Sequence, residues 1–577
     1  MGRSVVVALL ALLALACPAA AQGPLGPPND LLALGQGGGD TPDQAPVRKA
    51  PSPTFDAAPR AHCQPGSKPE PSVQGRVPAG SAVNGLWCNM AMIAHQGSSG
   101  GFRVYDYVDD QGHECAYYDT TLLFPSNAFN LTSTGLGVYV LDMTDPAKPV
   151  QTAALTEPSM LSPHESLNLN AKRGILAAVN GNPATEPGWV TFYDLHKDCR
   201  RPELDFSGPL ARLGHESGFS ADGKTFYAAG TAYRSITAID VTNPKSPFVV
   251  WQGDVQSHGL SLSSDGNRAY LANPDVEYGD LTILDTSQIQ ARKPNPHTRE
   301  LSRTTWDRVS IPQNALPFTK NGHPYVLEFD EYNAATLDPS GDPDMVGAAR
   351  ILDIADERAP TIVSNIRLQI DNPPDHKQYG DDPGADGSTS GGAQGYASHY
   401  CNIDSPVDPT LVACSFIASG LRLFDISDIA HPREVGYFVA PTGDANGSNF
   451  AMSQPAFVAK RREILWSDGN SGFYVLRVNP SVWNSATSQA TAPRTCGGRR
   501  LFSAHVKVPR HTRVRSATTT LAGRKVRVTV RGRLVTARVD LRRLRRSAVV
   551  LRIRVRLTNG RTITSRRTYH PCTKRIS

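Results

Sequence analysis

The sequence predicts an all-β protein, namely a seven-bladed β-propeller, with eight blades as the alternative, followed by a small basic Ig-like β-sandwich. Three observations support this fold class. A segment of alternating apolar residues that ends in an aspartate recurs along most of the 577 residues. Asp-Gly and Asn-Gly pairs separate alternating apolar runs, and no long stretch has the periodicity of an amphipathic helix. Repeated short strands joined by tight turns are typical of propeller blades, which bury their faces only against neighbouring copies.

The recurring aspartate segment sets the number of blades. It occurs as GFRVYD (101–106), GVYVLDMTDPAKP (137–149), WVTFYD (189–194), SITAIDVTNPKSP (235–247), LTILD (281–285), ARILDIADERAP (349–360), GLRLFDISDIAHP (420–432) and a degenerate GFYVLRVNP (472–480). The first and last copies can share one blade when a ring closes, so eight copies predict seven blades. Asp142, Asp240 and Asp425, each followed by a Thr or Ser and then by proline, are interpreted as turn-forming residues rather than calcium ligands.

The order of strands within a unit follows from its turns. Asp222-Gly223, Asp265-Gly266 and Asn321-Gly322 each lie between two alternating apolar runs, which is a strong hairpin signal. The proline-containing tail after each aspartate then leads into a further strand, such as PFVVWQG at 247–253. About four antiparallel strands per unit result.

Composition divides the chain into five parts. Residues 1–21 have the charged start, apolar run and small-residue cleavage site of a signal peptide. Residues 22–75 are rich in Pro, Gly and Ala and predict a flexible leader. We expect the propeller at 76–485, a linker at 486–495 and the basic domain at 496–577. The signal peptide implies a secreted or cell-surface protein with no transmembrane segment in the mature chain. A lipoprotein is not expected, because Cys17 lacks a leucine three residues earlier, where Ala14 stands.

The cysteines support an oxidising compartment. Removal of Cys17 with the signal peptide leaves eight of the nine cysteines, an even number. Cys401 and Cys414 flank a turn-rich segment and can pair across a hairpin, while Cys496 and Cys572 bracket the last domain. The remaining four are Cys63, Cys88, Cys115 and Cys199, which allow three pairings that the sequence does not decide.

Charge separates the chain into two bodies of opposite sign. Residues 496–577 hold 24 lysines and arginines and a single acid, Asp540, which leaves 35 basic and 52 acidic residues for the rest. Alternation of arginine with apolar residues predicts strands that expose one arginine-rich face. We expect binding to anionic wall polymers, membrane surfaces or a protein partner through Arg527, Arg531, Arg552, Arg554 and Arg556. Docking of this domain on the acidic propeller is the intramolecular alternative, and the scarcity of aromatic residues argues against nucleic acid.

One histidine position recurs relative to the hairpin turns. Counting back seven residues from the turn gives His164, His215, His258 and His399, and in a fifth unit Asn314. Equivalent positions of successive blades form a ring, so these imidazoles approach one another if their strand is the innermost. Several imidazoles suit a divalent transition metal such as zinc, copper or iron. Glu165, Glu216 and Asn314 are the supporting or alternative ligands.

A purely structural role is the alternative for these histidines. A residue repeated in each blade can serve as a cap that hydrogen-bonds the backbone of the next blade. Adjacent strand residues point to opposite faces, so Glu165 is not expected to act beside His164. The acidic loop with Asp381, Asp382 and Asp386 lacks EF-hand spacing and predicts a solvated loop. There is no P-loop, dinucleotide fingerprint or HExxH motif.

The segments GVYVLDMTDPAKP and GLRLFDISDIAHP resemble the repeats of LVIVD-repeat proteins, which are exported bacterial propellers. The resemblance covers about residues 85–480 and implies an extracytoplasmic propeller, but it implies no activity. Propeller oxidases with histidine-bound metals, such as the carotenoid-cleaving and methanethiol-oxidising families, are similar in architecture alone. Two functions therefore remain. The first is a non-enzymatic propeller that presents binding surfaces at the cell envelope, and the second is a metal-dependent oxidase or hydrolase centred on the histidines.

Overall fold

The computed structural model describes residues 39–51, 54–120, 137–181, 187–230, 234–274, 280–307, 310–336, 340–380, 395–445, 447–483, 501–509, 512–540 and 549–569. The chain divides into two compact units, Met1–Ala490 and Thr491–Ser577. The predicted signal peptide, the 486–495 linker and the acidic residues Asp381, Asp382 and Asp386 lie outside the described residues. Within the described residues, no helix is both long and apolar enough to cross a membrane.

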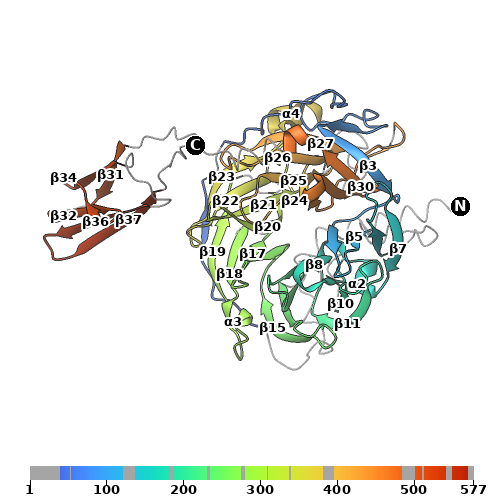
Figure 1. The fold of residues 1–577 in the computed structure, drawn as a ribbon, viewed down its shortest axis with the longest axis horizontal. Helices are drawn as coiled ribbons and strands as arrows, with labels where there is room; N and C mark the ends of the chain where they lie inside the picture. The colour runs from blue at the N-terminus through green and yellow to red at the C-terminus, as the bar shows by residue number, and fades with distance from the viewer. Residues whose placement is uncertain are drawn as a thin grey trace. The chain divides into compact units, whose positions relative to one another are not determined.

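The first unit is all-β and propeller-like. In its described residues, seven sheets follow one another along the chain, six of them with four consecutive antiparallel strands at their core. In Figure 1 the colour advances around a common centre from sheet to sheet. The first six sheets contain β4–β7 (Val104–Val108, Glu114–Asp119, Val138–Asp142, Val150–Leu155), β8–β11 (Asn168–Asn170, Ile175–Val179, Gly188–Asp194, Glu203–Ala211), β12–β15 (Glu216–Phe219, Thr225–Gly230, Ser235–Asp240, Phe248–Asp254), β16–β19 (Leu260–Leu262, Arg268–Ala272, Leu281–Asp285, Arg299–Thr305), β20–β23 (Ile311–Lys320, His323–Glu331, Ala349–Asp353, Thr361–Ile366) and β24–β27 (Ser398–Ile403, Leu411–Phe416, Gly420–Asp425, Arg433–Val439).

The seventh sheet joins the two ends of this unit. It contains β28 (Ala456–Val458), β29 (Glu463–Asp468) and β30 (Gly472–Val478), and its outer strand is β3 (Met90–Gln96) from the N-terminal part of the chain. Strands β28 and β29 also contact β4 of the first sheet. The first and last sheets of the unit are therefore neighbours.

Helices are short. Those in the described part of the chain are α2 (Pro158–Leu161), α3 (Ser287–Gln290), α4 (Pro373–Tyr379) and the 3₁₀ turns η2 (His164–Ser166), η3 (Ala171–Arg173), η4 (Gln369–Asp371) and η5 (Ala459–Arg461).

The repeated aspartate ends the third strand of its sheet and starts a turn. In six sheets its carboxylate accepts a hydrogen bond from the backbone N–H two residues later, at 2.8–3.1 Å. This bond is an Asx turn, which explains why aspartate recurs there. The segment 101–106 differs from the other copies, because it leads into β4, the first strand of its sheet. β3, not a shared copy of the repeat, completes the last sheet.

The predicted hairpin turns link the first and second strands. Asn321 and Gly322 form the two-residue turn between β20 and β21, with positive φ at both residues (54° and 72°). Asn-Gly suits this turn because asparagine tolerates, and glycine readily adopts, the left-handed conformation. Gly223 and Gly266 also have positive φ, at the turns that follow β12 and β16.

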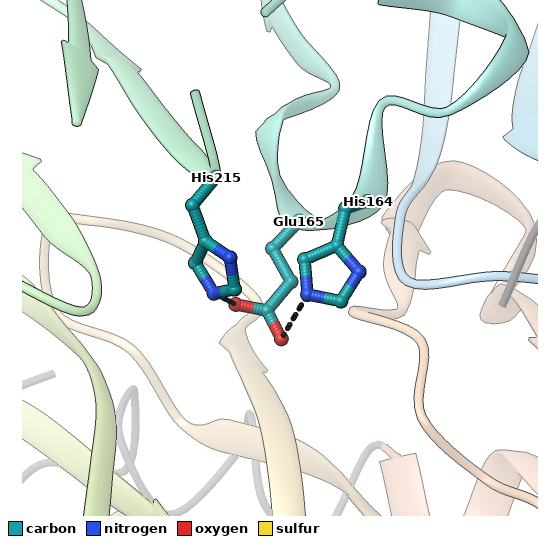
Figure 2. Close-up of side chains that lie close together, drawn as sticks. All are labelled: His164, Glu165 and His215. Atoms are coloured by element: carbon teal, nitrogen blue, oxygen red, sulfur yellow. Dashed lines mark ion pairs between the residues drawn. The ribbon is translucent and has the colours of Figure 1, made fainter. Parts of the chain in front are cut away.

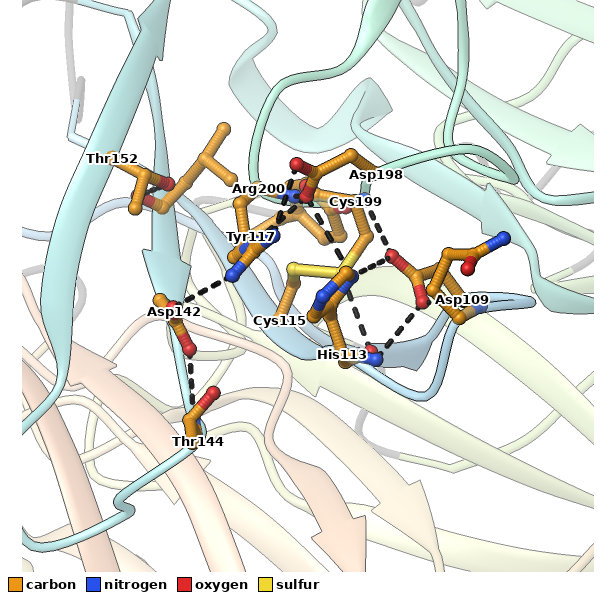
Figure 3. The surroundings of a disulfide bond; sticks show 12 residues. Asp109, His113, Cys115, Tyr117, Asp142, Thr144, Thr152, Asp198, Cys199 and Arg200 are labelled. Atoms are coloured by element: carbon orange, nitrogen blue, oxygen red, sulfur yellow. Dashed lines mark hydrogen bonds and ion pairs between the residues drawn. A yellow bond between two sulfur atoms is a disulfide. The ribbon is translucent and has the colours of Figure 1, made fainter.

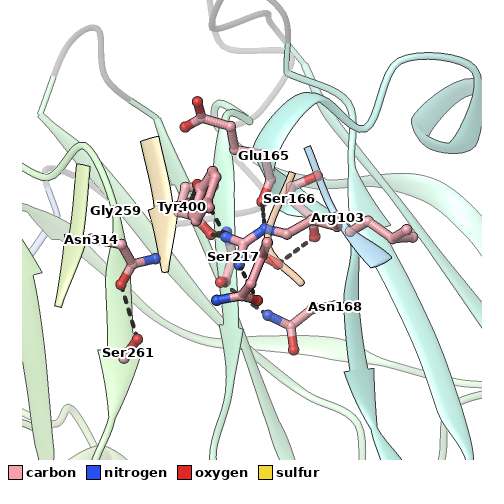
Figure 4. Close-up of polar contacts among 12 residues, drawn as sticks. Arg103, Glu165, Ser166, Asn168, Ser217, Gly259, Ser261, Asn314 and Tyr400 are labelled. Atoms are coloured by element: carbon pink, nitrogen blue, oxygen red, sulfur yellow. Dashed lines mark hydrogen bonds and ion pairs between the residues drawn. The ribbon is translucent and has the colours of Figure 1, made fainter. Parts of the chain in front are cut away.

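First strands of neighbouring sheets meet at the centre. β12 contacts β8 and β16, and β20 contacts β16 and β24. Polar side chains join them: the Ser217 hydroxyl donates to the Ser166 carbonyl at 2.5 Å, and the Asn168 amide donates to the Ser217 carbonyl at 3.2 Å (Figure 4). Residues on these strands, although far apart in sequence, therefore surround one axis.

The expected flexible leader at 22–75 is wrong for its described part. Residues 39–51 and 54–75, here called the N-terminal strap, lie against the sheets. β1 (Val47–Lys49) pairs in parallel with β19, and after the strap β2 (Leu86–Cys88) pairs with β27. The side chains of β1 are exposed, and it is held through its backbone as an edge strand. Such a strand needs no apolar alternation, so composition alone indicated a loose segment.

Three disulfides tie the first unit. Cys401–Cys414 pairs β24 with β25, which confirms the predicted hairpin bridge. The open choice among the other four cysteines resolves as Cys63–Cys88 and Cys115–Cys199. Beside the latter, the Asp109 carboxylate accepts the backbone N–H of Cys199 and that of His113, both at 2.9 Å (Figure 3). Cys496 and Cys572 lie outside the described residues.

The second unit contains two sheets that share one apolar core. One sheet has the order β31-β35-β34 and the other β33-β32-β36-β37. Inward Val, Leu and Ile side chains from both sheets, including Val535, Val539, Leu551 and Val555, are buried together. The strands are β31 (Leu501–Lys507), β32 (Val514–Leu521), β33 (Arg524–Lys525), β34 (Val528–Arg531), β35 (Leu534–Asp540), β36 (Val549–Leu557) and β37 (Thr562–Tyr569).

Candidate metal centre

The predicted histidines lie at the starts of first strands. His164 begins η2, ahead of β8, and His215 directly precedes β12. His258 stands two residues before β16, and His399 is the second residue of β24. First strands surround the axis, so all four imidazoles come to the centre of the first unit.

The structure brings the four imidazoles around one carboxylate. The Nε2 atoms of His164 and His399 lie 3.7 and 3.3 Å from Oε1 of Glu165. Those of His215 and His258 lie 3.2 and 3.6 Å from its Oε2. Neighbouring rings are close, with centroids 4.5 Å apart for His164 and His215 and 5.1 Å for His215 and His258. Nitrogens from four sheets therefore converge on one carboxylate, two at each of its oxygens.

Glu165 lies on the same side as His164, contrary to the expectation from strand geometry. The two residues belong to η2, not to a strand, and His164 has a φ of 50°. The rule of opposite faces for adjacent residues applies only to extended chain. The turn thus directs both side chains to the centre, where the Glu165 carboxylate lies between the rings of His164 and His215 (Figure 2).

Backbone carbonyls orient two of the imidazoles. Nδ1 of His258 donates to the Pro312 carbonyl at 2.8 Å, and Nδ1 of His399 donates to the Met452 carbonyl at 2.9 Å. A carbonyl can only accept, so Nδ1 of each ring carries a proton, and in the neutral form of the ring the Nε2 lone pair faces the centre. These bonds to the next sheet are the capping role expected as the alternative. These hydrogen bonds involve only Nδ1, so they do not explain why the Nε2 atoms converge on the Glu165 carboxylate.

The other two imidazoles have no such cap. Nδ1 of His164 and both ring nitrogens of His215 are buried without a hydrogen bond. A structural cap would satisfy at least one nitrogen of each ring, because buried polar atoms are normally hydrogen-bonded. Packing alone does not account for these two side chains.

The charges of the centre are mutually dependent. Burial would raise the pKa of Glu165, but the imidazoles of His164 and His215 outweigh it and hold that pKa well below its usual range. Burial and the neighbouring His215 lower the pKa of His164. For His399, burial opposes the charged form, yet the Glu165 and Glu331 carboxylates raise its pKa to about 9. In the metal-free protein a charged His399 therefore faces the two carboxylates of Glu165 and Glu331.

Sequence reasoning missed Glu331 and Gln313. Glu331 ends β21, and its oxygens lie 3.7 Å from Nε2 of His258 and 3.4 Å from Nε2 of His399. Gln313 donates to Oε2 of Glu165 at 2.5 Å. The fifth sheet thus supplies these two groups where others supply a histidine. The sequence signal that could have found them is a pair of polar residues, Gln313 and Glu331, on two adjacent strands of the unit that has Asn314 in place of the histidine.

Asn314 and Glu216 are placed differently from the imidazoles. The Asn314 side chain accepts from the Ser261 hydroxyl at 3.0 Å, on a contact between neighbouring first strands (Figure 4). Glu216 points away from the imidazoles, as expected for the strand residue after His215. It forms a buried ion pair with Arg103 at 2.5 Å and accepts the Tyr400 hydroxyl proton.

A buried polar layer supports the centre. Arg103 donates through Nε to the Glu165 carbonyl at 2.9 Å, and its guanidinium lies over the Tyr400 ring (Figure 4). Gln313 donates to both the Tyr400 oxygen and Glu165, so a continuous set of hydrogen bonds joins Glu216 to the central carboxylate. These hydrogen bonds hold Glu165 at its position along the central axis and fix the orientation of its carboxylate.

Phe102 forms an apolar wall. Its ring centroid lies 4.4 Å from that of His164 and 5.4 Å from that of His399. It comes from the first sheet and fills the gap between these imidazoles. Phe102 is itself 1% exposed, so this side of the two imidazoles packs against a buried apolar ring.

The donor set fits a divalent transition metal. His164, Glu165 and His215 offer ligand atoms within 4.8 Å of one another, and His258 and His399 add two further imidazoles. Imidazole nitrogen with carboxylate oxygen suits zinc, copper and iron. The second compact group, Asp109, His113 and Asp198, is already engaged: Asp109 accepts three backbone N–H groups and Asp198 binds Arg200.

The predicted anion-binding arginines are divided between two sheets. Arg552, Arg554 and Arg556 project from one face of β36 and are exposed, whereas Arg531 belongs to β34 of the other sheet. Arg527, also exposed, directly precedes β34.

Comparisons with known proteins reveal only distant similarity. No protein-family model matches the chain, and neither does any curated protein. The periplasmic gluconolactonase of Pseudomonas aeruginosa is 15% identical, with a TM-score of 0.40, over 59% of this chain and 87% of its own. Hydrazine synthase of Kuenenia stuttgartiensis is 12% identical, with a TM-score of 0.40, over 67% of this chain and 97% of its own. At these values the similarities carry no information on activity.

Proposed function

We propose that this chain is an exported, seven-bladed propeller of the LVIVD-repeat type that holds one divalent transition metal and works as a metal-dependent oxidase. The ligands would be His164, His215, His258 and His399, with Glu165 as a fifth donor or as the carboxylate that orients them. The observation that carries the proposal is the convergence of four Nε2 atoms on one buried carboxylate.

The burial of so many titratable groups supports a metal. All four histidines are no more than 8% exposed, and Glu165 is 2% exposed. Burial of charge without compensation is strongly unfavourable, and well-packed apolar residues would stabilise a fold at least as well. A cation bound at the centre would satisfy the orphaned Nε2 of His215 and would take the place of the proton on His399.

The number of donors favours redox chemistry over hydrolysis. Catalytic zinc sites keep three protein ligands and an open position for water. Four imidazoles and a carboxylate exceed that number and suit iron or copper, which accept more ligands. Such a metal, when bound, can activate dioxygen. The residues of this chain would position the metal, hold Glu165 through the Arg103 layer and exclude water at Phe102.

Three disulfides support the exported location, since such bonds persist in oxidising compartments. The seven sheets, of which the last is completed by β3, support the blade number. The two packed sheets of the second unit support an Ig-like sandwich.

Metal analysis of the full chain, produced without an affinity tag, tests the proposal. The protein is exposed to equimolar iron, copper and zinc, freed of unbound ions and analysed for metal by mass spectrometry. We expect one iron or copper per chain. His215→Ala and His258→Ala should each lose it while retaining the circular dichroism spectrum of the wild type.

His431→Ala is the matched control, because His431 is exposed and pairs only with Asp428 at the surface. It should keep the full metal content. A metal-free wild type, or equal metal in all four proteins, would sink the proposal and leave the ligand-presenting propeller. Stoichiometric zinc would instead indicate a hydrolase.

A second function is favoured by the basic second unit. Presentation of the propeller at the cell envelope needs an attachment to an anionic surface, and one face of this unit has the side chains for it.

A further inference from the structure

The outer face of sheet β33-β32-β36-β37 carries three rows of cationic and hydroxyl side chains. Directly paired residues of neighbouring antiparallel strands point to the same face. The rows follow from the strand register and are Lys525–Thr520–Arg552–Arg566, Thr518–Arg554–Thr564 and Ser516–Arg556–Thr562. We call these ten residues the arginine face.

The charge of this face is not neutralised within its own unit. Asp540 is the sole acid from residue 496 onward, and it lies at the end of β35 in the other sheet. Arg552, Arg554, Arg556 and Arg566 are all exposed. Among the described residues, no salt bridge involves any of them. Four guanidinium groups therefore face solvent together and would attract an anion.

The spacing suits an extended ligand. Arg552, Arg554 and Arg556 occupy alternate positions of β36, so their Cα atoms repeat about every 6.5–7 Å along a straight line. A compact anion would contact only one of them. A linear chain of anionic groups that runs along β36 can contact all three.

The hydroxyl groups indicate phosphate. Ser or Thr side chains flank the arginine column on both sides, at Ser516, Thr518 and Thr562 among others. Phosphate oxygens are bound by arginine together with Ser and Thr hydroxyls, and arginine matches phosphate in bidentate geometry. A carboxylate has fewer acceptor oxygens for these flanking donors.

The composition of the face argues against a membrane and against nucleic acid. None of its ten residues is aromatic or a large apolar side chain, so it has nothing to insert among lipid tails and no platform for base stacking. The exposed apolar side chains of this unit, Val530 and Leu534, lie on the other sheet.

We propose that the arginine face binds a linear polymer with phosphate groups along its backbone, of the kind found in cell walls. Binding depends on electrostatic attraction and weakens as salt rises, because neutralised phosphates release their counterions. The proposal is independent of the metal centre, which lies in the other unit, so either can fail alone.

The test uses the full chain and linear inorganic polyphosphate as the probe, with binding measured by fluorescence anisotropy at several salt concentrations. The triple variant Arg552→Gln/Arg554→Gln/Arg556→Gln should bind at least about tenfold more weakly. Its salt slope should fall by about 3, one for each lost phosphate contact.

The control variant Arg513→Gln/Arg524→Gln/Arg538→Gln removes the same charge from exposed positions that are not among the ten residues of the arginine face. We expect its affinity to stay within about twofold of the wild type, as for any loss of distant charge. Circular dichroism and thermal unfolding verify that both variants are folded. Equal weakening in the two variants would overturn the proposal, because net charge alone would then explain binding.

Two further probes distinguish the source of the anionic groups. Polyglutamate carries charge without phosphate, and phosphatidylglycerol vesicles carry phosphate on a membrane. Weaker binding of both than of polyphosphate supports the proposal. Equal binding of polyglutamate, preferential binding of vesicles, or no binding of polyphosphate by the wild type would each overturn it.

Discussion

Glu165 is the single side chain on which the centre depends. It is the counter-charge shared by four imidazoles, and η2 alone allows it to lie beside His164. Its neutral isostere should therefore change both metal binding and the stability of the metal-free protein.

We predict that Glu165→Gln lowers the free energy of unfolding of the metal-free protein by about 3 kcal/mol, because it removes one of the two carboxylates that stabilise a buried imidazolium at His399. Urea denaturation in the presence of a chelator measures the change. Glu357→Gln, which removes a carboxylate from a part-exposed pair with Arg268, should cost less than about 1 kcal/mol. An unaltered unfolding midpoint for Glu165→Gln would mean that the carboxylate does not contribute to the stability of the fold.

Asp280 offers a pH test away from the centre. Burial raises the pKa of Asp280 to about 7, with Asp330 adding to the shift and Thr305 and Arg350 opposing it. Between pH 4 and 7 the folded protein holds a proton that the unfolded chain has released. Stability due to this group therefore falls as pH rises through that window.

Asp280→Asn removes this titration and can still accept the hydrogen bonds of Thr305 and Trp306. We predict that the stability of the variant, relative to the wild type, is higher at pH 8 than at pH 5. Urea unfolding at the two pH values measures both proteins. Parallel pH curves would show that Asp280 is ionised throughout.

Single residues were predictable where a turn fixed their position. Counting from the hairpin turns found the four histidines, because the count fixes where each residue lies relative to the first strand of its sheet. The direction of Glu165 was not predictable, since the 3₁₀ turn at His164 has no apolar pattern. Glu331 was missed because it reaches the centre from a second strand.

At the scale of elements, the N-terminal strap shows how a segment without apolar periodicity can be ordered. Glu70 of the strap has a fully buried side chain and binds Arg422 at 2.7 Å, and Glu434 binds the same guanidinium at 3.0 Å. The strap therefore completes a buried ionic cluster of the sixth sheet. Sequence reasoning sees neither the backbone pairing of β1 nor this long-range pair.

We predict that Glu70→Gln destabilises the protein by about 3 kcal/mol, since it removes one partner from a buried ionic cluster. Thermal and urea unfolding measure the loss. Glu203→Gln is the control, because Glu203 pairs with Lys197 at the surface, and we expect a change of at most about 1 kcal/mol. Equal effects of the two substitutions would show that the strap contributes little to stability.

At the scale of the whole molecule, the pairing of β3 with β30 joins the ends of the first unit. The repeats predicted that consecutive strands pair within each sheet and that the histidines lie around a central axis, because they fix the order of strands within each sheet. The sequence did not reveal which strand completes the last sheet, since β3 lacks the motif of the repeats.

We predict that a chain shortened to begin at Gly97 loses its metal and aggregates, because the edge of β30 is then unpaired. A chain that ends at residue 490 removes only the second compact unit and should stay monomeric with its metal. Size-exclusion chromatography with metal analysis compares the two. Retention of metal by the chain from Gly97 would show that the centre forms without β3.

The strand exchange between the two ends also constrains biosynthesis. During synthesis the last sheet cannot be completed until residue 478, the end of β30, has left the ribosome. Its partner strand β3 left the ribosome nearly 400 residues earlier. Every imidazole of the centre is by then already synthesised. Under the metal binding and export proposed above, we therefore expect metal loading to be one of the latest events in maturation, so that the ions available outside the cytoplasm decide which metal the centre binds.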